Sequence, residues 1–241
     1  MIKAVFFDLY NTLVRFLPPL EEIQRQACLS EGLKVTDQGI RRGYALADNY
    51  FSEENSRYPL FKRSRQELDQ FFSEYERLIL KGAGVGASQE LALKVWRRTQ
   101  EIPKRLALFD DVPPALDRLR QLGLTLGGLS NLRPEMRDQM DSIGLFGLLD
   151  FVITSQEAGA QKPFPPIFQA ALERARVEPH EAVHVGDQYH SDVLGALGVG
   201  IKPVLLDRRG FYGEVETCPR VRDMAGLVKL LEEGSLDQGE R

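Results

Sequence analysis

The sequence predicts an α/β protein with a doubly wound parallel sheet and a helical domain inserted after the first strand. Short apolar runs, each the length of a buried strand, occur at the start of the chain and again between residues 125 and 206. Residues 110–207 alternate these runs with helical patterns, which is typical of parallel strands joined by helices. Between residues 15 and 104 no strand-like run occurs, and apolar residues recur at helical spacing.

Five segments are predicted as strands of the sheet because they are apolar and bounded by turn or helix signals. They are residues 2–7, 125–129, 151–154, 182–185 and 203–206. Prolines mark the helix starts, since proline fits the first turn: Pro113 follows Asp111, and Pro134 and Pro165 open the next two helices. Asp111 is expected to cap the first of these helices. The polar tail from residue 232 to residue 241 is expected to fray.

The inserted segment is predicted to be entirely helical. Its clearest helix opens with Ser64 and Glu67, which have the spacing of a capping box, and an aromatic stripe on one face indicates ordinary helix packing. A second helix is predicted to begin near Ser88. The predicted domains are residues 1–14 with 105–241 for the α/β domain and residues 15–104 for the helical domain.

Composition argues against several classes of protein. The 31 basic and 35 acidic side chains give a net charge of −4, which provides no basic surface for nucleic acid or an anionic membrane. No run approaches the roughly 20 apolar residues of a membrane span, and the chain opens on a strand-like run, so a cytoplasmic protein is expected. Cys28 and Cys218 lie far apart without histidines at zinc-ligand spacing, so neither a disulfide framework nor a structural metal is expected.

Polar residues follow four of the predicted strands. Asp8 follows the first strand, and Ser130 and Asn131 end the second. Lys162 lies in the loop after the third strand, and Asp187 follows the fourth. Because parallel strands end at one edge of the sheet, where open α/β sheets bind ligands, these side chains are expected to form one site.

The order of these residues resembles the motifs of the haloacid dehalogenase superfamily of hydrolases, across essentially the whole chain. Phosphatases of that family carry Asp-x-Asp-x-Thr, then Ser or Thr, then Lys, then Gly-Asp with a second acid four or five residues later. The matching residues are Asp8 with Thr12, Ser130, Lys162, and Gly186-Asp187 with Asp192. Residues 154–163 and 184–189 are also similar to animal members called dehalogenase-like hydrolases. The resemblance implies that the helical domain is a cap.

The resemblance also implies a Mg²⁺-dependent phosphatase that acts on a small phosphorylated metabolite. Asp8 would be the nucleophile and form an aspartyl phosphate, and Mg²⁺ would bind Asp8, Asp187 and the backbone carbonyl of Tyr10. Lys162 would stabilise the charge on Asp8 and on the phosphoryl group, and Asp192 would support this centre without binding the ion directly. The implied phosphate-binding groups are the hydroxyls of Thr12 and Ser130 and the backbone amides around Leu9 and Asn131.

Tyr10 departs from the phosphatase pattern, which has an aspartic acid there to protonate the departing alkoxide and then activate water. Such acid–base catalysis contributes about 10²–10⁴ in rate. A tyrosine, with a pKa of about 10, can donate a hydrogen bond but is a weak base. Slow turnover, or substrates with good leaving groups, would follow. The 2-haloacid dehalogenases carry Phe-Asp-x-Tyr-Gly-Thr-Leu, close to residues 7–13, and their halide leaves without protonation.

A metal-independent 2-haloacid dehalogenase with Asp8 as nucleophile is therefore the alternative, and Arg41 aligns loosely with the cap arginine that binds substrate in that branch. Dehalogenases, however, lack the acid at Asp187 and carry a tyrosine in place of Phe168. Two nearby carboxylates repel by several kcal/mol in a low-dielectric site unless a cation or a proton intervenes, and we therefore favour the magnesium phosphatase. A binding or regulatory protein that lost efficient catalysis at Tyr10 is a third alternative, because fold alone does not fix function.

Overall fold

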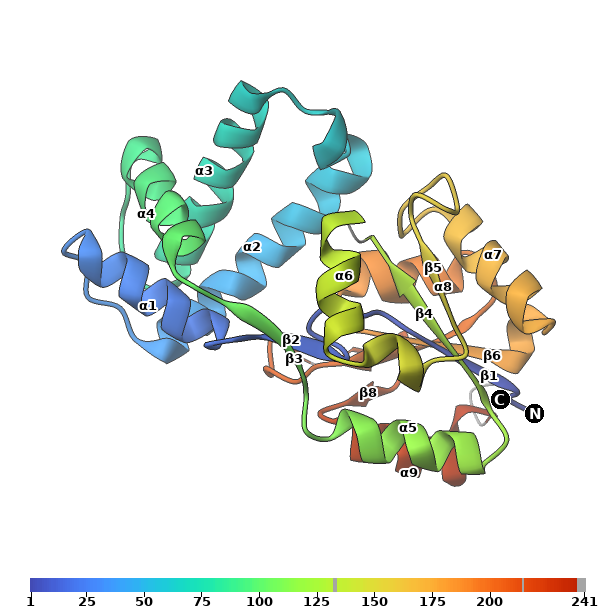
Figure 1. The fold of residues 1–241 in the computed structure, drawn as a ribbon. Helices are drawn as coiled ribbons and strands as arrows, with labels where there is room; N and C mark the ends of the chain where they lie inside the picture. The colour runs from blue at the N-terminus through green and yellow to red at the C-terminus, as the bar shows by residue number, and fades with distance from the viewer. Residues whose placement is uncertain (132–133, 214, 238–241) are drawn as a thin grey trace. The chain divides into compact units, whose positions relative to one another are not determined.

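The computed structural model describes residues 1–131, 134–213 and 215–237. The chain divides into two compact units, an α/β unit and a helical unit (Figure 1). The α/β unit comprises Met1–Arg15 and Leu106–Arg241, and the helical unit comprises Phe16–Arg105. The end of the polar tail, residues 238–241, lies outside the described residues, so its predicted fraying is not described.

The two passages of the chain between the units pair with each other as a two-stranded sheet of β2 (Val14–Leu17) and β3 (Arg105–Leu108). The expectation of no strand in this part of the sequence was therefore wrong. Each strand is only four residues long, and its partner lies about 90 positions away in the chain. Such a pairing leaves no periodic pattern in either segment alone.

The α/β unit is built on a parallel sheet with the strand order β5-β4-β1-β6-β7-β8. β1 lies between β4 and β6, with Ala4 opposite Thr125 on one side and Ala182 on the other. β1 is buried on both faces, which is why all four of its residues are apolar. The strands are β1 (Ala4–Phe7), β4 (Thr125–Ser130), β5 (Phe151–Thr154), β6 (Ala182–Gly186), β7 (Lys202–Leu206) and β8 (Arg220–Val221).

Helices cover both faces of this sheet (Figure 1). α7 and α8 pack on one face, where Phe6, Leu129 and Ile153 meet Ile167 and Phe168 of α7. α5 and α9 pack against each other on the opposite face. The predicted doubly wound α/β fold is therefore confirmed. The helices are α5 (Val112–Gln121), α6 (Pro134–Ser142), α7 (Pro165–Ala175), α8 (Gly195–Leu197) and α9 (Met224–Glu232), with 3₁₀ turns at Leu145–Leu148, Pro179–Glu181 and Ser235–Asp237 and a π-helix at Tyr189–Leu194.

The helical unit contains α1 (Leu20–Ser30), α2 (Asp37–Arg57), α3 (Arg65–Gly82) and α4 (Gln89–Glu101), with a 3₁₀ turn at Leu60–Lys62. The predicted capping box is present, since Glu67 N donates to Ser64 Oγ over 3.3 Å and Ser64 N donates to Glu67 Oε2 over 2.7 Å. The aromatic stripe packs inside the unit, where the Phe72 ring stacks on Trp96 with centroids 4.2 Å apart. Among the described helices, none combines the length and apolar character that a membrane span needs.

A carboxyl group is buried in this helical unit. Glu76 on α3 is fully buried, and its Oε1 accepts a hydrogen bond from Gln24 Nε2. The hydroxyl of Tyr44 donates to Gln24 Oε1 over 3.3 Å, which fixes the orientation of the amide. Within the described residues, Glu76 Oε2 has no hydrogen-bond partner. Burial raises the pKa of Glu76 to about 8, so the folded protein keeps this side chain protonated at neutral pH.

Glu76→Gln is expected to remove a pH-dependent loss of stability. The pKa of Glu76 is about 8 in the folded protein and near the ordinary value of 4.5 in the unfolded chain, so only the folded state holds this proton between those values. The free energy of unfolding therefore falls as the pH rises through this window and levels off above it. Denaturant unfolding across the window should show a shallower fall for E76Q. The control is Glu74→Gln, at a partly exposed position of α3, and equal slopes in the two variants would contradict the prediction.

Candidate active site

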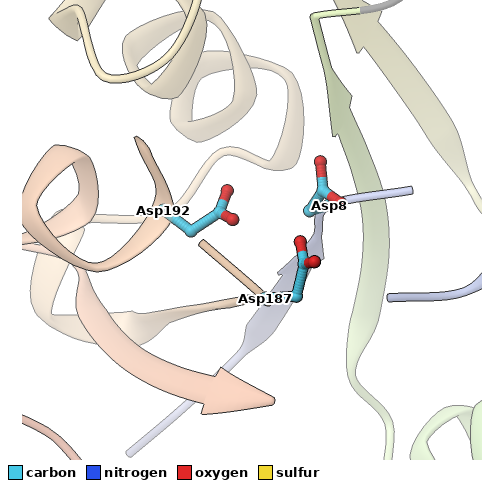
Figure 2. Close-up of side chains that lie close together, drawn as sticks. All are labelled: Asp8, Asp187 and Asp192. Carbon is cyan, nitrogen blue, oxygen red and sulfur yellow. The ribbon is translucent and has the colours of Figure 1, made fainter. Parts of the chain in front are cut away.

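The candidate active site lies at the edge of the sheet where β1, β4 and β6 end. Asp8 directly follows β1, and its backbone N–H donates to the carbonyl of Val185 on β6 over 2.8 Å. Asp187 directly follows β6, and Asp192 lies in the π-helix after it. Each of the three aspartates has a carboxylate oxygen within 4.8 Å of the others, and Figure 2 shows their side chains close together. The predicted convergence of acids is therefore present.

Lys162 is buried between two of these acids. Its Nζ donates to Asp8 Oδ1 and to Asp192 Oδ1, each over 2.6 Å, and its side chain is 3% exposed. Burial disfavours the ammonium form, but the carboxylates of Asp192 and Asp8 outweigh it and hold the pKa of Lys162 above its ordinary range. Lys162 is therefore a fixed positive charge in the site.

The pKa values of Asp8 and Asp192 are shifted in opposite directions. Burial raises the pKa of Asp8 to about 6, although the attraction of Lys162 opposes this shift. Burial acts on Asp192 too, but Lys162 and His184 outweigh it and hold the pKa of Asp192 well below its usual range. Lys162 pairs with Asp8 and Asp192, and Asp187 also offers a carboxylate oxygen within 4.8 Å of theirs. Several carboxylate oxygens this close together suit a hard divalent cation, so the residues present fit Mg²⁺.

Asp192 is oriented by its own neighbours. Its Oδ2 accepts a hydrogen bond from the backbone of Gln188 over 3.0 Å, and its Oδ1 lies 3.0 Å from His184 Nε2. Burial lowers the pKa of His184, so the ring is neutral and Nε2 carries the hydrogen that the ionised Asp192 accepts. Gly186 makes room for this arrangement, because a Cβ there would lie 2.2 Å from Asp192 Cγ.

The side chain of Asn131 fixes the loop that carries Lys162. Its Oδ1 accepts from Lys162 N over 2.8 Å, and its Nδ2 donates to Lys162 O over 3.1 Å. The sequence motif indicated only a backbone role for Asn131, because no local pattern connects an amide with a loop 31 residues away. Ser130 lies next to it, almost fully buried at the end of β4. Both predicted residues therefore belong to the same edge as Asp8.

The remaining predicted residues divide between the two units. Thr12 and Tyr10 lie in the loop after Asp8; Thr12 is fully buried, and its Oγ1 has no hydrogen-bond partner within the described part of the chain. A buried hydroxyl without a partner is available to donate a hydrogen bond to a bound anion. Arg41 lies on α2 of the helical unit, where its Nε is 3.3 Å from Glu21 Oε1.

Gly186→Ala is expected to destabilise the protein by about 1–3 kcal/mol, because the added methyl group overlaps the Asp192 carboxyl group. Gly198→Ala is a matched control, since its backbone φ of −61° suits alanine and its Cβ would keep ordinary contacts at 3.4 Å. Denaturant unfolding of the two variants checks this. Equal free energies of unfolding would contradict the close approach at Gly186.

Comparison with known proteins agrees with this geometry. A family model described as haloacid dehalogenase-like hydrolase matches residues 2–200. The human haloacid dehalogenase-like hydrolase domain-containing protein 3 is 30% identical over 92% of this chain and 86% of its own length. The glyceraldehyde 3-phosphate phosphatase of Methanopyrus kandleri is 30% identical over 90% of this chain and 88% of its own. A 2-haloacid dehalogenase structure from Pseudomonas syringae is 25% identical with a TM-score of 0.57, covering 97% of this chain and 100% of that one. The chain belongs to the haloacid dehalogenase-like hydrolase family.

Proposed function

We propose that this protein is a Mg²⁺-dependent phosphatase of small phosphorylated metabolites, with phosphorylated sugars as the substrate class. The observation that carries the proposal is Asp187 beside Asp8, with Lys162 bonded to Asp8. A dehalogenase has no use for the second acid, whereas a phosphatase needs a cation at this place. The similarity to a glyceraldehyde 3-phosphate phosphatase supports the sugar-phosphate class.

Asp8 and Asp187, with the backbone carbonyl of Tyr10, would hold the Mg²⁺ ion. The fit rests on the carboxylate oxygens, which lie within 4.8 Å of one another. When bound, the ion neutralises the charge repulsion between a carboxylate and an anionic phosphate ester. Asp192 would stay outside the ion's ligands, because both of its oxygens already accept hydrogen bonds from protein groups.

The protein's own groups then carry out the reaction. An oxygen of Asp8 forms a bond to phosphorus as the bond from phosphorus to the leaving oxygen breaks, which gives an aspartyl phosphate and an alkoxide that takes a proton from water, because Tyr10 stands where the family's phosphatases have their acid. Water then attacks this phosphorus and gives up a proton to the solvent, and phosphate leaves while the Asp8 carboxylate is restored. Lys162 keeps its charge throughout and offsets the negative charge of the transferring group, and the hydroxyls of Thr12 and Ser130 would donate to its oxygens.

The helical unit is proposed to be the cap domain that selects the substrate and excludes water. Arg41 stays a prediction as a substrate-binding residue of this unit. The dehalogenase alternative is favoured by Tyr10, which stands where a phosphatase has its acid, and by the similarity to a solved dehalogenase. The acid at Asp187 argues against it.

Asp8→Asn is expected to abolish phosphatase activity, with a loss of at least about 10³-fold, because the amide cannot act as the nucleophile. The assay uses Mg²⁺ with acetyl phosphate, p-nitrophenyl phosphate and glyceraldehyde 3-phosphate. Asp117→Asn, at an exposed position of α5, is the control and should keep full activity. Wild-type protein that hydrolyses none of these three compounds, or D8N that remains active, refutes the proposal. Chelator-resistant halide release from 2-chloropropionate would favour the alternative instead.

Tyr10→Asp is expected to raise turnover of esters with poor leaving groups, because it supplies the missing general acid and base. The gain should be about 10- to 100-fold for alkyl phosphates and much smaller for acetyl phosphate, whose leaving group needs no proton. Tyr10→Phe separates the effect of the carboxyl group from loss of the hydroxyl, and it should leave the alkyl rate within about threefold. Rates measured on both ester classes check this prediction, and an equal gain on both classes would count against it.

A further inference from the structure

The segment after β7 holds the loop that follows β1. Arg208 Nε and Nη2 donate to the carbonyl oxygen of Thr12 over 3.2 and 3.0 Å. Thr12 belongs to the loop of residues 8–12, which also carries Asp8 and Tyr10. The side chain of Arg208 is 12% exposed, so little water competes for these bonds. Arg208 lies outside the motif residues named in the sequence analysis.

The guanidinium of Arg208 is itself held on two further sides. Its Nη1 and Nη2 donate to the two carboxylate oxygens of Asp111 over 2.8 and 3.0 Å, and its Cζ lies 4.0 Å from the centroid of the Phe109 ring. Asp111 Oδ2 also accepts from the backbone N–H of Met224, at the start of α9. Asp111 is the N-cap residue of α5, as predicted, but its side chain makes no capping hydrogen bond, because this carboxylate accepts hydrogen bonds from Arg208 and Met224 instead.

The neighbouring arginine holds the same loop at a second point. Arg209 Nη2 donates to Asn11 Oδ1 over 3.0 Å. Asn11 has a φ of 62°, in the left-handed region that costs energy for residues other than glycine and is easiest for asparagine and aspartate. A loop in this conformation persists only when its surroundings fix it. Arg208 and Arg209 supply such contacts at Thr12 and Asn11, the two residues at the turn.

We propose that Arg208 is a positioning residue for phosphoryl transfer: by fixing the Thr12 carbonyl against Asp111, it keeps the loop of residues 8–12 in place for the phosphoryl group. The kinetic part of this inference rests on the proposed function, whereas the ordering of the loop does not. A loop that supplies both the nucleophile and a buried hydroxyl tolerates little displacement, because a shift of about 1 Å can cost about 10² in rate.

Three variants test the inference. Arg208→Met removes every hydrogen bond of the guanidinium. Arg208→Lys keeps the charge, but an ammonium group lacks the planar set of donors that binds Thr12 and both oxygens of Asp111 at once. Arg118→Met is the matched control, because Arg118 contacts Glu232 through Nε and Nη2 over 2.7 and 2.6 Å and joins α5 to α9 without a bond to the loop.

We expect R208M to lower kcat by about 10- to 100-fold and R208K to fall between R208M and wild type, with R118M within about twofold of wild type. The change in kcat is expected to exceed the change in KM, since the loop acts on the transferring group. Hydrogen exchange of the backbone amides of residues 9–13 is expected to accelerate in R208M and to match wild type in R118M.

Two results overturn the inference: wild-type exchange at residues 9–13 in R208M, or equal losses of kcat in R208M and R118M at matched thermal stability. Failure of the proposed function is distinguishable. If the wild-type protein hydrolyses no phosphate ester, the proposed function fails, and the exchange comparison between R208M and R118M alone decides whether Arg208 positions the loop.

Discussion

The site depends on one buried ammonium group that is shared by two carboxylates. Lys162 lies 2.6 Å from both Asp8 and Asp192, and taking such charges out of water costs several kcal/mol each unless they are paired in good geometry. Neighbouring groups therefore hold Lys162 and Asp192 in place. Asn131 holds the peptide of Lys162 at both its N–H and its C=O, and the backbone at Gly186 leaves space for the Asp192 carboxyl group.

The same edge of the sheet gathers three carboxyl groups. A purely structural ion pair would need one acid for Lys162, yet Asp8, Asp187 and Asp192 all approach within 4.8 Å of one another. The pKa of Asp8 is raised, because burial disfavours the ionised carboxylate by more than the attraction of Lys162 favours it. Perturbed ionisation in a cluster of acids is typical of functional sites, and here it accompanies a nucleophile position and a place for a cation.

Each site segment is held by a side chain from another part of the α/β unit. Arg208, after β7, holds the loop that carries Asp8, and Asn131, after β4, holds the loop that carries Lys162. His184, within β6, holds Asp192. Loops at the edge of a parallel sheet have no ladder of hydrogen bonds of their own beyond the strand ends, so contacts between loops supply their rigidity. These hydrogen bonds hold the functional side chains at the edge of the sheet in a fixed geometry.

The sequence by itself determined what depends on neighbouring residues. The apolar runs marked five strands of the main sheet, the spacing of Ser64 and Glu67 marked a helix start, and the ordered motifs marked the acids and the lysine. Only the tertiary structure decided which side chains serve distant partners. The Asp111 carboxylate pairs with Arg208 and makes no side-chain cap on α5, and the Asn131 side chain is hydrogen-bonded to Lys162. Arg208 donates to the Thr12 carbonyl, 196 positions away in the chain. The physical reason is that helix and strand periodicity reflects contacts within a few residues, whereas these hydrogen bonds form only after the sheet brings its loops to one edge.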